Sequence, residues 1–237
     1  MIEHVYRRAA EARGIDAVVV ATDDPRVATT VEGFGGIARM TGAHHRTGMD
    51  RIAEVARDLT CAIIVNVQGD EPLVEPSAIA LMVEALNNDP ALQMATLRTP
   101  IRREEDYESP HVVKVVVDAS DNALYFSRAP IPHHRDNPAR AGRHDSDVGS
   151  GFSRIAYKHL GLYAYRRDFL LRLATLPQTA LEQAESLEQL RALEHGHRIR
   201  AVETQHDSIG VDTPEDLERV RSAFALARFG ETEATRA

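Results

Sequence analysis

The sequence has a single cysteine, no tryptophan and no long apolar run. One cysteine, Cys61, excludes a disulfide framework and a zinc ribbon, and it is compatible with the cytosol. No apolar run approaches the ~20 residues of a membrane-spanning helix, and residues 1–14 form an amphipathic pattern unlike that of a signal peptide. We therefore expect a cytoplasmic protein with no membrane partner.

Positive charge is also scarce. The chain carries 28 Lys and Arg against 36 Asp and Glu, a net charge of −8, which argues against nucleic acid as a partner. Lys114 and Lys158 are the only lysines, so almost every cation is an arginine, the side chain that holds carboxylates and phosphates bidentately. The length of 237 residues, with 43% hydrophobic residues, predicts a single globular domain over 1–237.

Short β-branched runs alternate with helical patterns along the first half. Ala17–Ala21 and Ala62–Val67 predict strands that are buried on both faces, as in a parallel sheet. Helices are predicted over Glu3–Arg13, Arg26–Phe34, Gly48–Arg57 and Pro76–Asn87. This order predicts an α/β fold, a doubly wound parallel sheet flanked by helices.

The second half has a different pattern. Turn residues at 118–122 separate two apolar runs, which predicts a hairpin of Val112–Val117 with Ala123–Phe126. A helix over Ser186–Glu194 and a strand over Ile199–Val202 follow, and Thr213 with Pro214 and Asp216 predicts a capped helix running to about Phe229. Residues 133–153 are polar and aperiodic, which predicts a mobile surface loop.

Two acidic residues stand where ligands bind in such folds, just beyond the carboxyl ends of strands. Asp70 directly follows the Ala62–Val67 run, and Asp212 precedes the last helix cap. Each acid can equally stabilise a turn or cap a helix. As a converging pair they would suit a Mg²⁺ ion at a phosphoryl-transfer centre.

Other polar residues have two interpretations each. The start of the helix at Thr47–Arg51 can bind an anion or polar base edge, or it can be a plain capped helix. Arg128 and His159 lie beside apolar strands and can hold a substrate carboxylate or hydroxyl, or be structural. Gly33–Gly36 follows a helix, which favours a helix end over a dinucleotide loop.

Five motifs, the second of them in two parts, carry a specific resemblance. They are NVQGDEP at 66–72, KVV and ALYFSR at 114–116 and 123–128, KHLGLY at 158–163, LEQLR at 187–191 and GVDTPEDL at 210–217. In this order they resemble the 3-deoxy-manno-octulosonate (Kdo) cytidylyltransferases of Gram-negative bacteria, also called CMP-Kdo synthetases. The resemblance extends from Met1 to about residue 225.

The resemblance implies a Rossmann-like nucleotidyltransferase with a substrate and dimerisation lobe at approximately residues 112–200. It implies the Mg²⁺-dependent reaction CTP + Kdo → CMP-Kdo + pyrophosphate, used in lipopolysaccharide biosynthesis, and a homodimer. A cytidylyltransferase for another sugar acid such as sialic acid is an alternative, against which NVQGDEP and KHLGLY argue.

The resemblance also implies roles for single residues. Asp70 and Asp212 would bind Mg²⁺ and, with Arg128, serve catalysis. The residues implied around the sugar acid are Gln68, Arg128, His159, Tyr163, Glu188 and Gln189. Those implied around the nucleotide are Thr47, Gly48, Arg51 and Gln68. Met49 departs from the threonine usual in the family.

One part of the family pattern is missing from this sequence. Family members begin with a buried strand and a loop of the type P-A-R-x-x-S-x-R-x-P-G-K-P, which grips the triphosphate, whereas Met1–Val5 matches the helix after that loop. Two explanations are open: a start upstream of Met1, or a shortened, non-catalytic paralogue that binds a sugar acid or pairs with an active subunit.

Overall fold

The structure is a computed structural model that describes residues 1–45, 47–133, 156–207, 210–211 and 213–234. The chain forms two compact units. The first comprises Met1–Met40, Val67–Ala80 and Ser208–Ala237, and the second Thr41–Asn66 and Leu81–Asp207. Among the described helices, none combines the length and apolar character needed to cross a membrane.

The first unit contains a strand–helix–strand motif. Strand β1 (Val19–Thr22) leads into helix α2 (Pro25–Gly33) and then into β2 (Ile37–Met40), which pairs with β1 in parallel. The Asp24 carboxylate accepts a hydrogen bond from the Arg26 amide at 2.8 Å and caps α2, as Pro25 at the first helical position suggests.

The predicted burial of this first strand is wrong. Val19, Val20 and Ala21 are half-buried, because β1 has β2 as its only strand neighbour in the described part of the chain.

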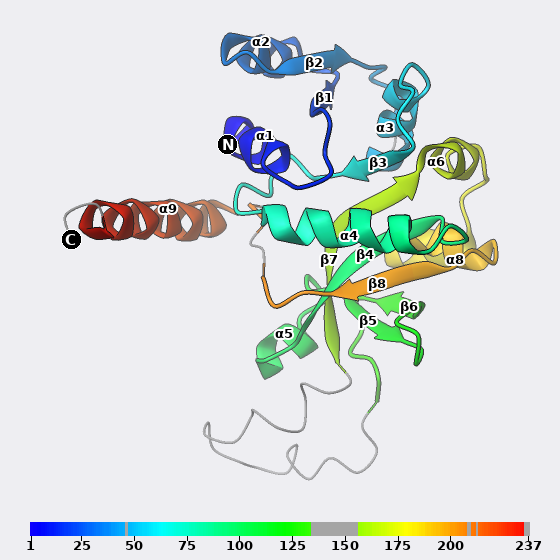
Figure 1. Cartoon of the computed structure of the whole chain (residues 1–237). Coiled ribbons are helices and arrows are strands. Elements are labelled where there is room, and N and C mark those ends of the chain that lie inside the picture. Colours follow the sequence, from blue (N-terminus) through cyan, green and yellow to red (C-terminus); the bar gives the residue numbers. More distant parts are fainter. Residues whose placement is uncertain (46, 134–155, 208–209, 212, 235–237) are drawn as a thin grey trace. The chain divides into compact units, whose positions relative to one another are not determined.

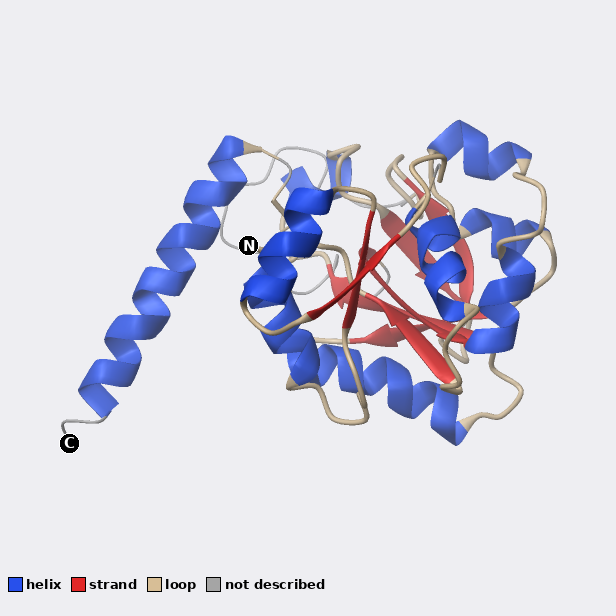
Figure 2. Ribbon diagram, turned by 90° about the horizontal axis from the view of Figure 1, so that it is seen from above, coloured by secondary structure: helices blue, strands red, loops and turns tan. Residues whose placement is uncertain are grey.

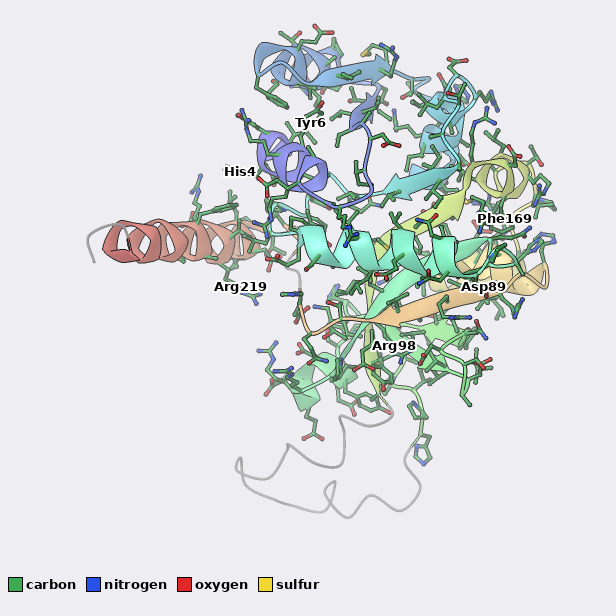
Figure 3. The ribbon with its side chains drawn as sticks, viewed as in Figure 1. His4, Tyr6, Asp89, Arg98, Phe169 and Arg219 are labelled. Carbon is green, nitrogen blue, oxygen red and sulfur yellow. The ribbon has the colours of Figure 1, made fainter. Side chains whose placement is uncertain are left out.

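Two further helices belong to this unit. Helix α1 (Ile2–Ala10) turns Tyr6 edge-on to Phe34, with ring centroids 5.3 Å apart, and His4 toward Phe224, at 4.5 Å (Figure 3). Helix α9 (Pro214–Ala234) begins with a reciprocal cap, in which Thr213 and Asp216 each accept the other's backbone N–H at 3.2 Å. The predicted helix start at Thr213 is therefore confirmed.

The second unit is built on a mixed sheet (Figure 1). Its described strands are β3 (Ile63–Asn66), β4 (Met94–Pro100), β5 (Lys114–Val117), β6 (Ala123–Ser127), β7 (Tyr157–Arg166) and β8 (Ile199–Glu203). Strand β7 lies antiparallel to β3, β4 and β5, while β8 is parallel to β4. Most strands therefore run in one direction, and β5 with β6 forms the predicted hairpin.

Helices pack against this sheet (Figure 2). The described helices of this unit are α3 (Gly48–Ala56), α5 (Glu104–Glu108), α6 (Arg167–Leu173), α7 (Ala180–Glu185) and α8 (Leu190–Glu194), and α4 (Pro76–Asn88) belongs partly to each unit. Buried side chains of α3, α6 and α8 form one apolar core with the strands. The α/β fold class predicted from the sequence is thus confirmed.

One predicted helix is wrong. The sequence suggested a continuous helix over Ser186–Glu194, but Ser186 has a φ of 53°, in the left-handed region, and ends α7. The next helix begins only at Leu190. The chain between the two helices carries Glu188, so this break decides where that side chain lies.

Candidate functional site

The KHLGLY segment forms a distorted stretch of β7. Leu97 of β4 lies opposite Leu160, whereas the adjacent Thr96 lies opposite Tyr163, so two residues of β7 are extra at this point. The distortion leaves His159 and Tyr163 close together, with ring centroids 5.5 Å apart. The structure therefore brings together two of the residues predicted around the sugar acid.

His159 is a neutral imidazole with a defined tautomer. Its Nε2 lies 2.9 Å from the Thr96 hydroxyl oxygen, and that hydroxyl donates its proton to the Leu162 carbonyl at 2.7 Å. Nε2 must therefore carry the proton and donate to Thr96, which leaves Nδ1 as an acceptor. Burial lowers the pKa of His159 to about 3, so the ring is uncharged at neutral pH.

Tyr163 is a neutral phenol beside this imidazole. Burial, and secondarily the negative charge of Glu188, raises its pKa well above the usual value. The Tyr163 hydroxyl therefore keeps its proton and can donate a hydrogen bond. Together the two rings offer one acceptor and one donor, the pair of functions that recognises a sugar hydroxyl group.

Glu188, between α7 and α8, contacts the start of α3. Its carboxylate accepts from the Met49 amide at 3.3 Å and hydrogen-bonds the Thr47 side chain, and burial raises its pKa. Thr47 itself caps α3 by accepting from the Asp50 amide at 3.2 Å. A residue predicted at the sugar acid is thus attached to the segment predicted at the nucleotide.

Arg51 is oriented within the same segment. Its Nη1 donates to the Thr41 hydroxyl at 2.7 Å, which ties the first turn of α3 to the chain that precedes it. Gly48 is the first residue of α3. The three residues predicted at the nucleotide end in this unit, Thr47, Gly48 and Arg51, therefore share one helix start.

Arg128 follows β6 and is half-buried. Its Nε donates to the Glu185 carbonyl at 2.8 Å and its Nη1 to the Pro110 carbonyl at 3.2 Å. Among the described residues, no carboxylate lies within ion-pair distance of this guanidinium. The carboxylate of Glu185 interacts with this charge electrostatically but does not pair with it, so an anionic ligand can still pair with the guanidinium directly.

Two buried side-chain amides have no hydrogen-bond partner among the described residues. They are Nδ2 of Asn66, at the end of β3, and Nε2 of Gln189. A buried amide without a partner costs about 1–3 kcal/mol, so each is a candidate to bind a ligand oxygen. Gln189 was predicted at the sugar acid from the sequence, whereas Asn66 was not, although Asn66 is the first residue of the NVQGDEP motif.

Asp70 lies in the first unit. Its carbonyl accepts from the Val211 amide at 2.9 Å, so the chain that precedes Asp212 lies beside the NVQGDEP loop. Gln68 belongs to the same turn, since its carbonyl accepts from the Glu71 amide at 3.3 Å. Asp212 lies outside the described residues, as does most of the loop predicted at 133–153.

The chemistry of this loop fits a hard divalent cation. Carboxylate oxygens are the ligands that Mg²⁺ takes from proteins, and it keeps several waters. Such an ion does not need a cage of protein groups, and within the described ranges there is no group of three or more His, Cys, Asp or Glu that could hold a metal. Asp70 supplies one candidate ligand.

Comparison with known proteins gives one consistent result. A family profile described as cytidylyltransferase matches residues 1–199. The chain is 56% identical to the 3-deoxy-manno-octulosonate cytidylyltransferase of Geobacter sulfurreducens over 222 residues, which cover 93% of this chain and 87% of that protein. It is 54% identical to the protein of the same name from Pelobacter propionicus over 224 residues, 94% of this chain and 87% of that protein.

A solved structure agrees with these relatives. CMP:2-keto-3-deoxy-manno-octonic acid synthetase complexed with CTP superposes with a TM-score of 0.84 at 43% sequence identity, covering 95% of this chain and 88% of that one. A likeness of fold alone extends to 4-diphosphocytidyl-2C-methyl-D-erythritol synthase from Anaerococcus prevotii. That comparison has a TM-score of 0.57 at 13% identity and covers 94% of this chain and 88% of that one.

Proposed function

This chain belongs to the cytidylyltransferase family, and from that premise we propose that it transfers the cytidylyl group of CTP to Kdo, giving CMP-Kdo and pyrophosphate. The observation that carries the proposal is the 56% identity, over 93% of the chain, to an enzyme of that name. The product is an activated sugar acid for lipopolysaccharide biosynthesis. In the reaction a sugar hydroxyl attacks the α-phosphorus of CTP and pyrophosphate leaves in line.

Arg128 binds the carboxylate of the sugar acid in this proposal. A carboxylate close to a triphosphate is repelled by it, and a guanidinium with no carboxylate partner among the described residues offsets that repulsion. The same interaction selects a sugar acid over a neutral sugar. Arg128 thereby orients the attacking hydroxyl toward the nucleotide.

His159 and Tyr163 bind hydroxyl groups of the sugar. Nδ1 of the neutral imidazole accepts a hydrogen bond from one sugar hydroxyl, and the phenol donates a hydrogen bond to a hydroxyl oxygen. Glu188 and Gln189 complete the predicted sugar-acid set, with Gln189 offering the unpartnered amide noted above.

Two segments carry the residues proposed at the nucleotide, the start of α3 and the NVQGDEP loop. Thr47, Gly48 and Arg51 are proposed to contact the cytidine end, and Gln68 both substrates. Asp70 and Asp212 would hold Mg²⁺, which when bound neutralises phosphate charge and lowers the pKa of the attacking hydroxyl. With Arg128, these two carboxylates form the proposed catalytic set.

We further propose a cytoplasmic homodimer that pairs through the lobe at 112–200. Two exposed leucines in that range support the proposal, Leu124 on β6 at 63% exposed and Leu181 on α7 at 40%. Leu124 stands on an edge strand of the sheet, where a second copy can cover it. Sedimentation of the wild type and of Leu124→Lys would test this: the variant should be monomeric.

A substrate panel tests the proposed reaction. Pyrophosphate release is measured with CTP, Mg²⁺ and either Kdo or sialic acid, and each component is omitted in turn. We expect release with Kdo that requires all three components, and little release with sialic acid. Preference for sialic acid, or release that ignores the sugar acid, would overturn the assignment of the substrate.

A further inference from the structure

The carboxylate of Glu185, the last residue of α7, contacts the end of β6. One carboxylate oxygen accepts from the Ser127 hydroxyl at 2.6 Å and the other from the Arg128 amide at 2.9 Å. The Tyr125 hydroxyl lies 3.4 Å from the first oxygen. Burial alone would raise the pKa of Glu185, but these hydrogen bonds lower it overall, so the group is a carboxylate at neutral pH.

The backbone of Glu185 holds the side chain of the same arginine. Its carbonyl accepts from Nε of Arg128 at 2.8 Å. A single residue of α7 therefore fixes both the main chain and the guanidinium of Arg128. The left-handed conformation of Ser186 directly afterwards turns the chain away from this contact.

A buried lysine fixes the remaining side of the Arg128 backbone. Lys114 is fully buried on β5, and its Nζ donates to the Arg128 carbonyl at 2.5 Å and to the carbonyls of Ser109 and Val112. Both the amide and the carbonyl of Arg128 are thus bound by charged side chains, which give stronger hydrogen bonds than neutral ones.

This arrangement leaves one edge of the guanidinium for a ligand. Arginine has five N–H donors, and those on Nε and one on Nη1 are occupied by carbonyls. The end formed by Nη1 and Nη2 has no other partner in the described part of the chain. Glu185 places its carboxylate on the backbone of Arg128, so the guanidinium feels that charge electrostatically but forms no ion pair with a described residue.

We infer that Glu185 is a positioning residue that holds the Nη1–Nη2 end of Arg128 toward the carboxylate of the sugar acid. The inference rests on the proposed function, in which Arg128 binds that carboxylate. It predicts that loss of the Glu185 side chain weakens binding of the sugar acid and leaves binding of the nucleotide unchanged. A purely structural role would affect both substrates alike.

A double-mutant cycle tests the inference on the full chain. The KM values for Kdo and for CTP are measured for the wild type, Glu185→Ala, Arg128→Ala and the double variant. We expect Glu185→Ala to raise the KM for Kdo about 10- to 100-fold, as a misplaced binding group does, and to leave the KM for CTP unchanged. In the Arg128→Ala background the same substitution should have almost no further effect.

Two further variants keep the test decisive. Gln183→Ala changes an exposed residue of the same helix and should behave as the wild type. Glu185→Gln keeps the shape and one acceptor, so an intermediate KM for Kdo is expected. If Glu185→Ala does not fold, Glu185→Gln alone decides, and an unchanged KM for Kdo then overturns the inference.

The outcomes separate this inference from the proposed function. Glu185→Ala with the wild-type KM for Kdo, or with an equal additional loss in the Arg128→Ala background, overturns the positioning role and leaves the reaction intact. A wild type that shows no Kdo-dependent release of pyrophosphate overturns the proposed function itself, and the positioning role with it.

Discussion

The imidazole of His159 donates from Nε2 to the hydroxyl of Thr96 across 2.9 Å, and that hydroxyl donates in turn to the carbonyl of Leu162. The two bonds tie strand β4 to the irregular stretch of β7 and determine the tautomer of the imidazole. Because the Thr96 side chain is fully buried, water does not compete for either bond. The acceptor that His159 offers to a ligand therefore depends on Thr96.

Thr96→Val should lower the free energy of unfolding by about 1–3 kcal/mol, because it leaves the His159 N–H and the Leu162 carbonyl without their partner. Urea denaturation measures the loss. Thr99→Val is the matched control, since Thr99 lies on the same strand, is 4% exposed and has no hydroxyl bond among the described residues. Equal losses from the two substitutions would contradict the role assigned to Thr96.

Acid should destabilise the protein through His159. Its pKa is about 3 in the folded state, below the ordinary value of 6.5, so the unfolded state binds the proton more tightly. The stabilisation is present above pH 6.5 and is lost as the pH falls toward 3, by about 2 kcal/mol at about pH 5.

His159→Gln tests this, because it keeps a neutral donor that does not titrate. Urea denaturation at about pH 7 and about pH 5 should show a smaller acid loss for this variant than for the wild type. His195→Gln, at an exposed position, should keep the wild-type loss. A wild-type pH dependence in His159→Gln would show that the buried imidazole is not the cause.

Removing one partner of the buried ion pair of Arg191 and Glu182 should destabilise the protein. The side chains are 3% and 4% exposed, and two hydrogen bonds of 2.9 and 2.5 Å join them. Glu182→Ala leaves a buried cation with the looser partner Asp50, at 3.7 Å, and should lower the free energy of unfolding by about 3 kcal/mol.

The exposed pair of Arg221 and Glu218, with an N–O distance of 2.6 Å, is the control for that substitution. Both of its side chains are more than half exposed, so Glu218→Ala should have little effect on urea denaturation. Equal losses of stability in the two alanine variants would show that burial does not increase the contribution of the Arg191 pair to the free energy of unfolding.

Asp70→Asn should abolish most of the Mg²⁺-dependent activity. The amide keeps the size of the side chain but removes the charge that holds a hard cation, so turnover should fall roughly 100-fold or more. The measurement is pyrophosphate release over a range of Mg²⁺ concentrations, with Asp58→Asn, at an exposed position, as the control. A wild-type response to Mg²⁺ in Asp70→Asn would remove this residue from the proposed metal site.

Local chemistry made part of this structure predictable from the sequence. The caps at Asp24, Thr47 and Thr213 involve residues two or three positions apart, so their patterns are visible in the sequence. The hairpin of β5 and β6 was predictable for the same reason, from the turn residues between its strands.

Contacts between distant segments were not predictable in this way. Glu185 and Arg128 are 57 positions apart, and the residues around either one do not predict their contact. The antiparallel entry of β7 between β3 and β4 follows from packing of the whole sheet. Ser186 takes a left-handed conformation without the glycine that usually signals one.

The most direct test of the account is the formation of CMP-Kdo itself. Mass spectrometry would follow the sugar nucleotide and a coupled assay the pyrophosphate, for the 237-residue chain and for the same chain with the family's first strand and triphosphate loop added ahead of Met1. The account predicts one pyrophosphate per CMP-Kdo, formed only when CTP, Kdo and Mg²⁺ are all present. Binding of Kdo with no CMP-Kdo from either chain would contradict it and favour a sugar-acid-binding protein.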